Sequence, residues 1–152
     1  MNTQQHHPVL AQLHTWLNQQ PSVLWPVLYM LAIFGLSSVP GVIPEDAAAP
    51  YQIFNWVPPA IQNLLHIPVY AGLAFLWRWY WAVPLRPLAA TLMALLITIS
   101  YGVFDEWYQL FVPGRYASLT DVLFNSIGAG LGVLAYSWIN RTLYTKTSTA
   151  SG

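Results

Sequence analysis

Four long runs of apolar residues dominate the chain, and short polar segments rich in proline and glycine separate them. The runs cover residues 23–39, 64–83, 88–109 and 119–139. Each is close to the ~20 residues with which a helix crosses a hydrocarbon core of ~30 Å. None shows the strict alternation of apolar and polar residues that is typical of strands, and lipid admits only helices or closed barrels. The pattern therefore predicts an all-α polytopic membrane protein, folded as a bundle of four transmembrane helices.

The connections between the runs carry residues that end helices and form turns. Proline-glycine pairs stand at 40–41 and 113–114, and both residue types terminate helices. The longest connection covers 41–63, and Ser118, three residues before Asp121, is a candidate N-cap for the last helix. The predicted organisation is a polar or interfacial segment at 1–21, a four-helix membrane domain at 22–140 and a disordered tail at 141–152.

The composition agrees with a lipid solvent and excludes several classes of function. Hydrophobic residues make up 56% of the chain and charged residues 7%, against ~25% charged residues in a typical soluble domain. The formal net charge is zero, which argues against a nucleic-acid partner, because binding phosphates needs a basic surface. The chain has no cysteine, so disulfides and thiolate catalysis are excluded.

The basic residues predict how the bundle sits in the membrane. With four spans, both termini and the turn at 83–87 share one side, which holds Arg78, Arg86, Arg141 and Lys146. The opposite side holds Arg115 alone. The positive-inside rule therefore places both termini in the cytoplasm of a multi-pass protein of the plasma (inner) membrane. All acidic residues fall on the outer side in this topology, namely Glu45, Asp46, Asp105, Glu106 and Asp121.

Polar residues that are far apart in the sequence lie at one membrane level, near the outer ends of the predicted helices. His66 and Tyr70 are four residues apart, as are Asp121 and Asn125, so each pair shares a helix face. Ionisable groups in membrane segments are costly, usually face the bundle interior and commonly serve function. We therefore expect one polar pocket with these ligand-binding residues: Ser38, His66, Tyr70, Asp105, Glu106, Gln109, Arg115, Asp121 and Asn125.

The acids and the histidine of this set allow two kinds of chemistry. The candidate catalytic residues are His66, Asp105, Glu106 and Asp121, since a histidine with a carboxylate supplies a general acid and a general base. The same four residues suit a divalent metal as cofactor. Oxygen ligands favour Mg²⁺ or Ca²⁺, and a set that includes imidazole favours Zn²⁺ or Mn²⁺. A structural use stays open, because Arg115 can pair with an acid across the turn and Asp121 can cap the last helix.

Two further features concern packing. Residues 128–132 contain a Gly-x-x-x-Gly motif, which lets two helices in lipid approach closely. Packing inside the bundle is the favoured use of Gly128 and Gly132, and a homodimer through the same face is the alternative. Arg78 is expected to extend past the neighbouring tryptophans to the cytoplasmic interface.

The stretch between the third and fourth runs carries a recognisable motif. It reads Asp105-Glu106-x-x-Gln109, then Pro113-Gly114-Arg115, then Ser118-x-x-Asp121-x-x-x-Asn125-x-x-Gly128. With His66-x-x-x-Tyr70-x-x-Leu73 and Ser37-Ser38-x-Pro40, it resembles the signature of the VanZ-like membrane proteins over about residues 25–140. The resemblance implies a four-helix membrane fold and, through the family's namesake, a link to resistance to the glycopeptide antibiotic teicoplanin. It implies no particular reaction.

Three functions of different classes fit these observations. The first, which we favour, is recognition of an envelope lipid or a cell-wall precursor by its headgroup, with Arg115 holding a phosphate or carboxylate. The second is an enzyme that acts on such a headgroup, as a hydrolase or transferase with or without a metal. The third is a structural or assembly subunit. The chain lacks the Gly-x-Ser-x-Gly, His-Glu-x-x-His and phosphate-loop motifs that would favour known enzyme classes.

Overall fold

The computed structural model describes residues 12, 21–41 and 59–150, and the regular structure in these ranges is helical. The helices are α2 (Leu24–Ser37), α4 (Pro59–Trp81), α5 (Pro87–Gln109) and α6 (Leu119–Ala150). No strand occurs within the described ranges. The prediction of an all-α chain with a helix at each apolar run is confirmed. Most of the predicted N-terminal segment and residues 42–58, with Glu45 and Asp46, lie outside the described residues.

Two helices are longer than the apolar runs predict. α4 begins at Pro59 instead of residue 64, because proline suits the first helical position, where an N–H group would have no partner in the helix. α6 continues to Ala150, although the sequence predicts a disordered tail from residue 141. Residues 141–150 contain neither glycine nor proline, so no residue in this segment forces a helix that is already nucleated to end.

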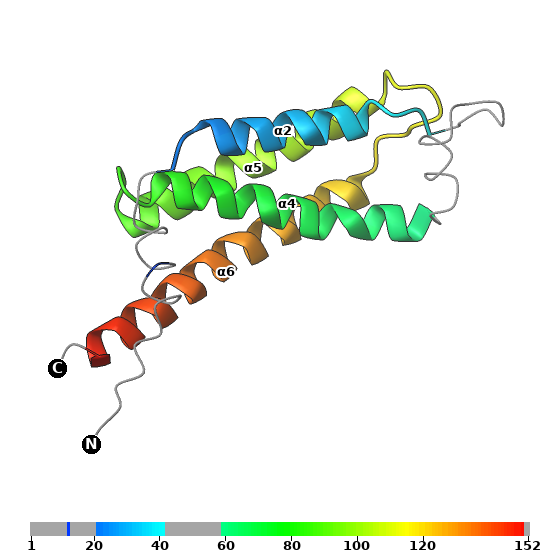
Figure 1. Ribbon diagram of the computed structural model, residues 1–152. Helices are drawn as coiled ribbons and strands as arrows, with labels where there is room; N and C mark the ends of the chain where they lie inside the picture. The colour runs from blue at the N-terminus through cyan, green and yellow to red at the C-terminus, as the bar shows by residue number, and fades with distance from the viewer. Residues whose placement is uncertain (1–11, 13–20, 42–58, 151–152) are drawn as a thin grey trace.

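α4 is the central helix of the bundle. It packs against α2, α5 and α6, and the shared core consists of side chains from all four helices: Ile33, Tyr70, Leu73, Ala74, Trp77, Ala94, Ala129 and Val133. Consecutive described helices alternate in direction, so the C-terminal ends of α2 and α5 lie at the same end as the N-terminal ends of α4 and α6 (Figure 1). We call this end of the bundle the site end. At the other end, α6 extends beyond its neighbours (Figure 1).

The Gly-x-x-x-Gly motif brings the backbones of α4 and α6 together within one chain. A Cβ on Gly128 would overlap the backbone oxygen of Ile67, and a Cβ on Gly132 would overlap that of Ala71. In contrast, Gly130 has nothing within 4 Å of the place where its Cβ would stand. The two glycines of the motif therefore serve the contact between α4 and α6.

The surface of the bundle is largely apolar, and part of its interior is polar. On α5, Leu88, Leu92 and Leu96 are more than half exposed, and their spacing of four residues aligns them in one outward stripe. The buried polar side chains include Asp105, Glu106, Gln109, Asp121 and Asn125. In water-soluble proteins charged side chains are mostly exposed, so this reversed arrangement indicates a lipid solvent.

Two of the described helices are long and apolar enough to cross a membrane, namely α5 and residues Leu119–Leu143 of α6. α2 is apolar, but its 14 residues extend over only about 21 Å at 1.5 Å per residue. α4 has 23 residues and carries His66 and Arg78 within its sequence. By length and hydropathy, two of the four predicted spans are therefore present in the described part of the chain.

Arg78 is buried, and the prediction that it extends to the interface is wrong. Its guanidinium carbon lies 4.7 Å from the centre of the Tyr136 ring, and its Nε donates to Thr91 Oγ1 at 3.1 Å. A cation over an aromatic face is attracted by the ring quadrupole. These contacts tie α4 to α5 and α6 at the end opposite the site end, which offsets part of the cost of burying the charge.

The close contact of α4 and α6 predicts that Gly132→Ala destabilises the protein while Gly130→Ala does not. The added methyl group at 132 would overlap backbone of Ala71, and overpacking of this kind costs about 1–3 kcal/mol. At 130 the methyl group meets open space. Thermal unfolding of the detergent-purified variants measures both effects, and equal melting temperatures would contradict the proposed packing.

Candidate functional site

A pocket at the site end lies between the helices and the turn that joins α5 to α6. Its volume is about 510 Å³, within the ~300–1,000 Å³ of typical small-molecule sites. Part of its lining is apolar and comes from α2 and α4, including Ile33, Leu36, Leu65 and Val69. The polar part comes from all four helices and the turn: Ser37, Asn63, His66, Tyr70, Asp105, Gln109, Arg115, Ser118 and Asp121.

Most of the residues that the sequence singles out converge here. Those that line the pocket are His66, Tyr70, Asp105, Gln109, Arg115 and Asp121. Glu106 and Asn125 are not among the lining residues, but both approach His66. Ser38 does not line the pocket either; its hydroxyl donates to Phe34 O at 2.7 Å and lies 3.1 Å from Tyr108 OH.

Asp105 is the hub of a buried hydrogen-bond network. Its Oδ2 accepts from Ser37 Oγ at 2.9 Å, from Tyr70 OH at 3.1 Å and from Gln109 Nε2 at 3.4 Å. These donors belong to α2, α4 and α5, so one carboxylate oxygen ties three helices together. Its Oδ1 is buried and has no hydrogen-bond partner among the described residues. Ser37, which the ligand-binding set omits in favour of Ser38, is therefore the serine that reaches the site.

Glu106 joins α5 to the first turn of α6. Its Oε2 accepts the backbone N–H of Ser118 at 3.1 Å. The Ser118 hydroxyl in turn accepts the backbone N–H groups of Thr120 and Asp121, which makes Ser118 the N-cap that the sequence predicts. In a capping box the third helical residue bonds back to the N–H of the cap. Here the carboxylate of Glu106, on α5, accepts the Ser118 N–H instead, so the carboxylate of Asp121 is not needed for capping.

His66 lies where α4, α5 and α6 meet. Its Nδ1 lies 2.9 Å from Asn125 Oδ1, and because an amide oxygen can only accept, Nδ1 donates in this bond. The same nitrogen lies 4.0 Å from Glu106 Oε1. The ring of Tyr70 is nearly parallel to the imidazole, with the two ring centres 6.2 Å apart. These neighbours restrict the orientation of the imidazole ring.

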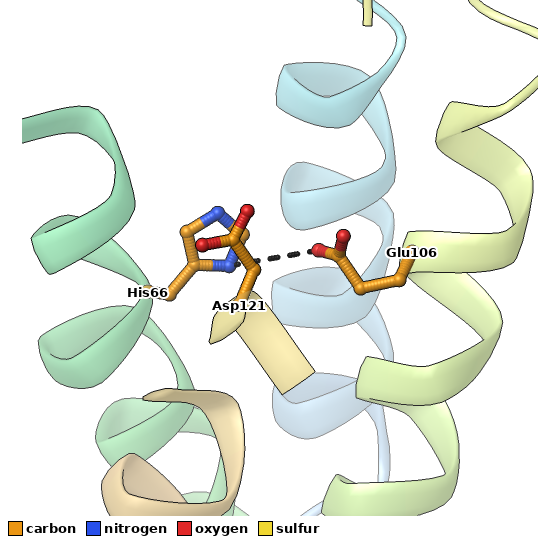
Figure 2. A group of neighbouring side chains, drawn as sticks. All are labelled: His66, Glu106 and Asp121. Carbon is orange, nitrogen blue, oxygen red and sulfur yellow. Dashed lines mark ion pairs between the residues drawn. The ribbon is translucent and has the colours of Figure 1, made fainter. Parts of the chain in front are cut away.

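Three side chains point toward one another from three helices, His66 from α4, Glu106 from α5 and Asp121 from α6 (Figure 2). One ligand atom from each lies within 4.8 Å of the other two, so the three could hold a metal ion. Asp105 is a metal candidate on the sequence alone, but it is not part of this group. Its Oδ2 is engaged by three donors instead.

The glycines of two connecting segments let the turn between α5 and α6 touch the segment that follows α2. Gly114 has a φ of 73°, which glycine adopts without the strain that a side chain would cause. The N–H of Gly41 donates to Pro113 O at 3.0 Å, and a Cβ on Gly41 would overlap Gly114. The turn is thereby held over the end of α2.

Arg115 binds the C-terminal end of α2. Its Nε donates to Val39 O at 3.1 Å and its Nη2 to Leu36 O at 3.5 Å. A positive charge is favourable there, because the last carbonyl groups of a helix carry partial negative charge. The proposed pairing of Arg115 with an acid is not seen, since no ion pair joins it to a carboxylate of the described residues.

The site end buries more negative than positive charge. Asp105, Glu106 and Asp121 are each at most 6% exposed. An ion pair joins Glu106 to His66 and requires a protonated imidazole. A buried carboxylate without a partner is costly. The arrangement therefore leaves buried negative charge that a bound cation or an amine would neutralise.

These features define an all-helical membrane protein in which polar side chains of four helices meet at one end of the bundle. The sequence model of the VanZ/LLP1 family matches residues 10–140, and the chain therefore belongs to this family. The resemblance seen in the sequence motifs is confirmed. No curated protein and no solved structure matches the chain.

The contacts of Arg115 predict a graded loss of stability when it is replaced. Arg115→Ala removes both donors from the end of α2, and hydrogen bonds that involve a charged group contribute about 1.5–3 kcal/mol. Arg115→Lys keeps the charge but loses the planar fork that reaches two carbonyls, so its melting temperature should lie between those of the wild type and Arg115→Ala. The control is Arg86→Ala at the other end of the bundle, where the side chain is exposed. An unchanged melting temperature for Arg115→Ala would show that these bonds contribute nothing.

Proposed function

We propose that this protein binds the polar headgroup of a membrane lipid or a lipid-linked cell-envelope precursor in the pocket at the site end. The observation that carries the proposal is the mixed lining of the pocket, with polar residues from four helices beside apolar residues of α2 and α4. A lipid-linked molecule presents a polar headgroup and an apolar chain to the same site. The lining suits both parts at once.

The polar groups suit a headgroup that carries an anion together with amines or hydroxyls. A guanidinium has five N–H donors, and Arg115 uses one on Val39 O and one on Leu36 O. The remaining donors are available to a phosphate or carboxylate. Asp105 and Asp121 each have an Oδ1 atom without a partner among the described residues, which suits the donors of an amino alcohol or a sugar.

An enzyme that acts on such a headgroup is the second candidate. The approach of His66 Nδ1 to Glu106 Oε1 at 4.0 Å favours it, because an imidazole beside a carboxylate is a common arrangement for general acid–base catalysis. Both candidates place the ligand in the same pocket. If the ligand is a cell-wall precursor, this pocket also offers a route by which the protein would affect susceptibility to teicoplanin.

A pocket-filling variant and a matched surface variant test headgroup binding. Val69 lines the pocket, so Val69→Phe should weaken binding at least about tenfold, which corresponds to 1.4 kcal/mol. Val103→Phe makes the same change on the exposed face of α5 and should bind as the wild type does. The probes are a short-chain polyprenyl phosphate and a short-chain phosphatidylethanolamine, measured by native mass spectrometry of the detergent-purified protein. Equal binding of both probes by the two variants would rule out this pocket.

We further propose that all four helices cross the membrane, with both termini in the cytoplasm. α4 packs along both α5 and α6, and α2 packs on α4 and α5. If the two helices that are both long and apolar enough to span a membrane cross it, their packed neighbours cross with them. The charged residues of α4 do not oppose this, because His66 and Arg78 are turned into the bundle, where they are 16% and 6% exposed.

Single cysteines test this topology, since the chain has none of its own. Tyr116 is 84% exposed in the turn at the site end, and Arg86 is exposed in the turn at the other end. A membrane-impermeant maleimide should label Tyr116→Cys in intact cells and Arg86→Cys only after permeabilisation. The opposite pattern would reverse the orientation, and equal labelling in intact cells would show that α5 does not cross.

A further inference from the structure

We propose that His66, Glu106 and Asp121 form a binding site for one divalent transition-metal ion, with Zn²⁺ and Mn²⁺ as the ions that the ligands suit. The site goes beyond headgroup binding and does not depend on it. Its three side chains come from three helices and point to a common centre (Figure 2).

The distances are close to those of a coordination sphere. The three ligand atoms lie within 4.8 Å of one another. Around Zn²⁺ with bonds of 2.0–2.2 Å in a tetrahedral arrangement, ligand atoms are about 3.3 Å apart. Side-chain rotations that move each atom by about 1 Å close this difference, because all three atoms are at the tips of side chains. Because Nδ1 of His66 donates to Asn125, its Nε2 is the nitrogen left to bind an ion. One imidazole nitrogen and two carboxylate oxygens are zinc-binding atom types, and their number equals the three protein ligands of catalytic zinc sites.

The electrostatics of Asp121 independently point to a cation. Its side chain is only 6% exposed, and its Oδ1 has no hydrogen-bond partner among the described residues. Capping of α6 does not account for this carboxylate, since Glu106 bonds to the Ser118 N–H in its place. A buried carboxylate oxygen without a partner is costly, and a metal ion in this position would remove the cost.

The three side chains are held from behind in the way that metal ligands usually are. Asn125 Oδ1 accepts from His66 Nδ1 at 2.9 Å, which fixes the imidazole ring. Glu106 is held by the Ser118 N–H at 3.1 Å and lies 3.5 Å from Gln109 Nε2. Such outer partners orient the ligands of metal sites and raise metal affinity. Asn125 is therefore a positioning residue in this proposal.

The place of the ion suggests what it does. His66 and Asp121 both line the pocket, so coordination positions that the protein does not fill would be directed at the contents of the pocket. A metal ion there polarises a phosphoryl or carbonyl oxygen of a bound molecule. The ion would also supply positive charge that the buried acids of the site end lack.

Metal titration of the full-length protein, purified in detergent and stripped with a chelator, tests the site. Isothermal titration calorimetry with Zn²⁺ and with Mn²⁺ should show one ion per chain. His66→Ala, Glu106→Gln and Asp121→Asn should each lower the affinity by about 100-fold or more, since loss of an outer partner alone already costs about 10–100-fold. Asp105→Asn is the matched comparison, because it removes a buried carboxylate that is not in the group. Its effect should stay below about tenfold.

A second variant changes the choice of metal and does not rely on a loss of binding. His66→Cys introduces the sole thiol of the chain, and a soft thiolate favours Zn²⁺ and Cd²⁺ over Mn²⁺. The variant should bind Cd²⁺ with a new ultraviolet thiolate–metal band and should lose Mn²⁺. Thermal unfolding without metal verifies that each variant is folded. The proposal is overturned if the wild type binds neither ion saturably, if Asp105→Asn weakens binding as much as the three ligand variants do, or if His66→Cys leaves the metal preference unchanged.

Discussion

The close approach of α4 and α6 is the contact on which the rest of the bundle depends. Gly128 and Gly132 leave no room for side chains between the two helices, so backbone lies against backbone. In lipid there is little hydrophobic drive to bring helices together, and such close packing takes its place. Gly128 meets the carbonyl of Ile67, the residue next to His66, and Asn125 lies one turn before it on α6. The same contact therefore brings His66 within hydrogen-bond distance of Asn125.

Buried donors and acceptors need hydrogen-bond partners, and this requirement arranges the polar groups at the site end. Asp105 accepts from the hydroxyl groups of Ser37 and Tyr70, and Glu106 accepts from the Ser118 N–H at the start of α6. Asp105 does this with Oδ2 alone, so its Oδ1 is left without a partner among the described residues, and the Oδ1 of Asp121 is left in the same way. These two oxygen atoms are the ones that a bound ligand or ion would meet. In Asp105, one carboxylate oxygen therefore stabilises the bundle and the other remains able to bind a ligand.

The sequence predicts the helices well because apolar runs of this length in lipid leave few alternatives to a helix. It also predicts that His66, Asp105 and Asp121 converge, since their positions near helix ends follow from the order of the spans. It does not predict the acceptors of Arg115, which are the backbone carbonyls of Leu36 in α2 and of Val39 just after α2 and have no signature in the sequence. The sequence also does not predict that Glu106 accepts the Ser118 N–H in place of a residue of α6, because this contact depends on how α5 and α6 pack. It does not predict that Arg78 is buried, because the Tyr136 ring that holds the guanidinium lies on another helix.

The attachment of α2 has a consequence for how the pocket can work. At the site end α2 is bonded through Ser37 to Asp105, and Arg115 bonds to a carbonyl of its last turn and to the Val39 carbonyl that follows it. Ser37, Asp105 and Arg115 all line the pocket. A molecule that accepts from Arg115 or donates to Asp105 in place of these bonds competes with α2 for them. By thermodynamic linkage, such a molecule and the docked position of α2 oppose each other to the same extent in both directions. A molecule that uses only the free donors of Arg115 and the free Oδ1 of Asp105 leaves α2 docked, so the atoms that a guest engages decide whether this wall of the pocket stays in place.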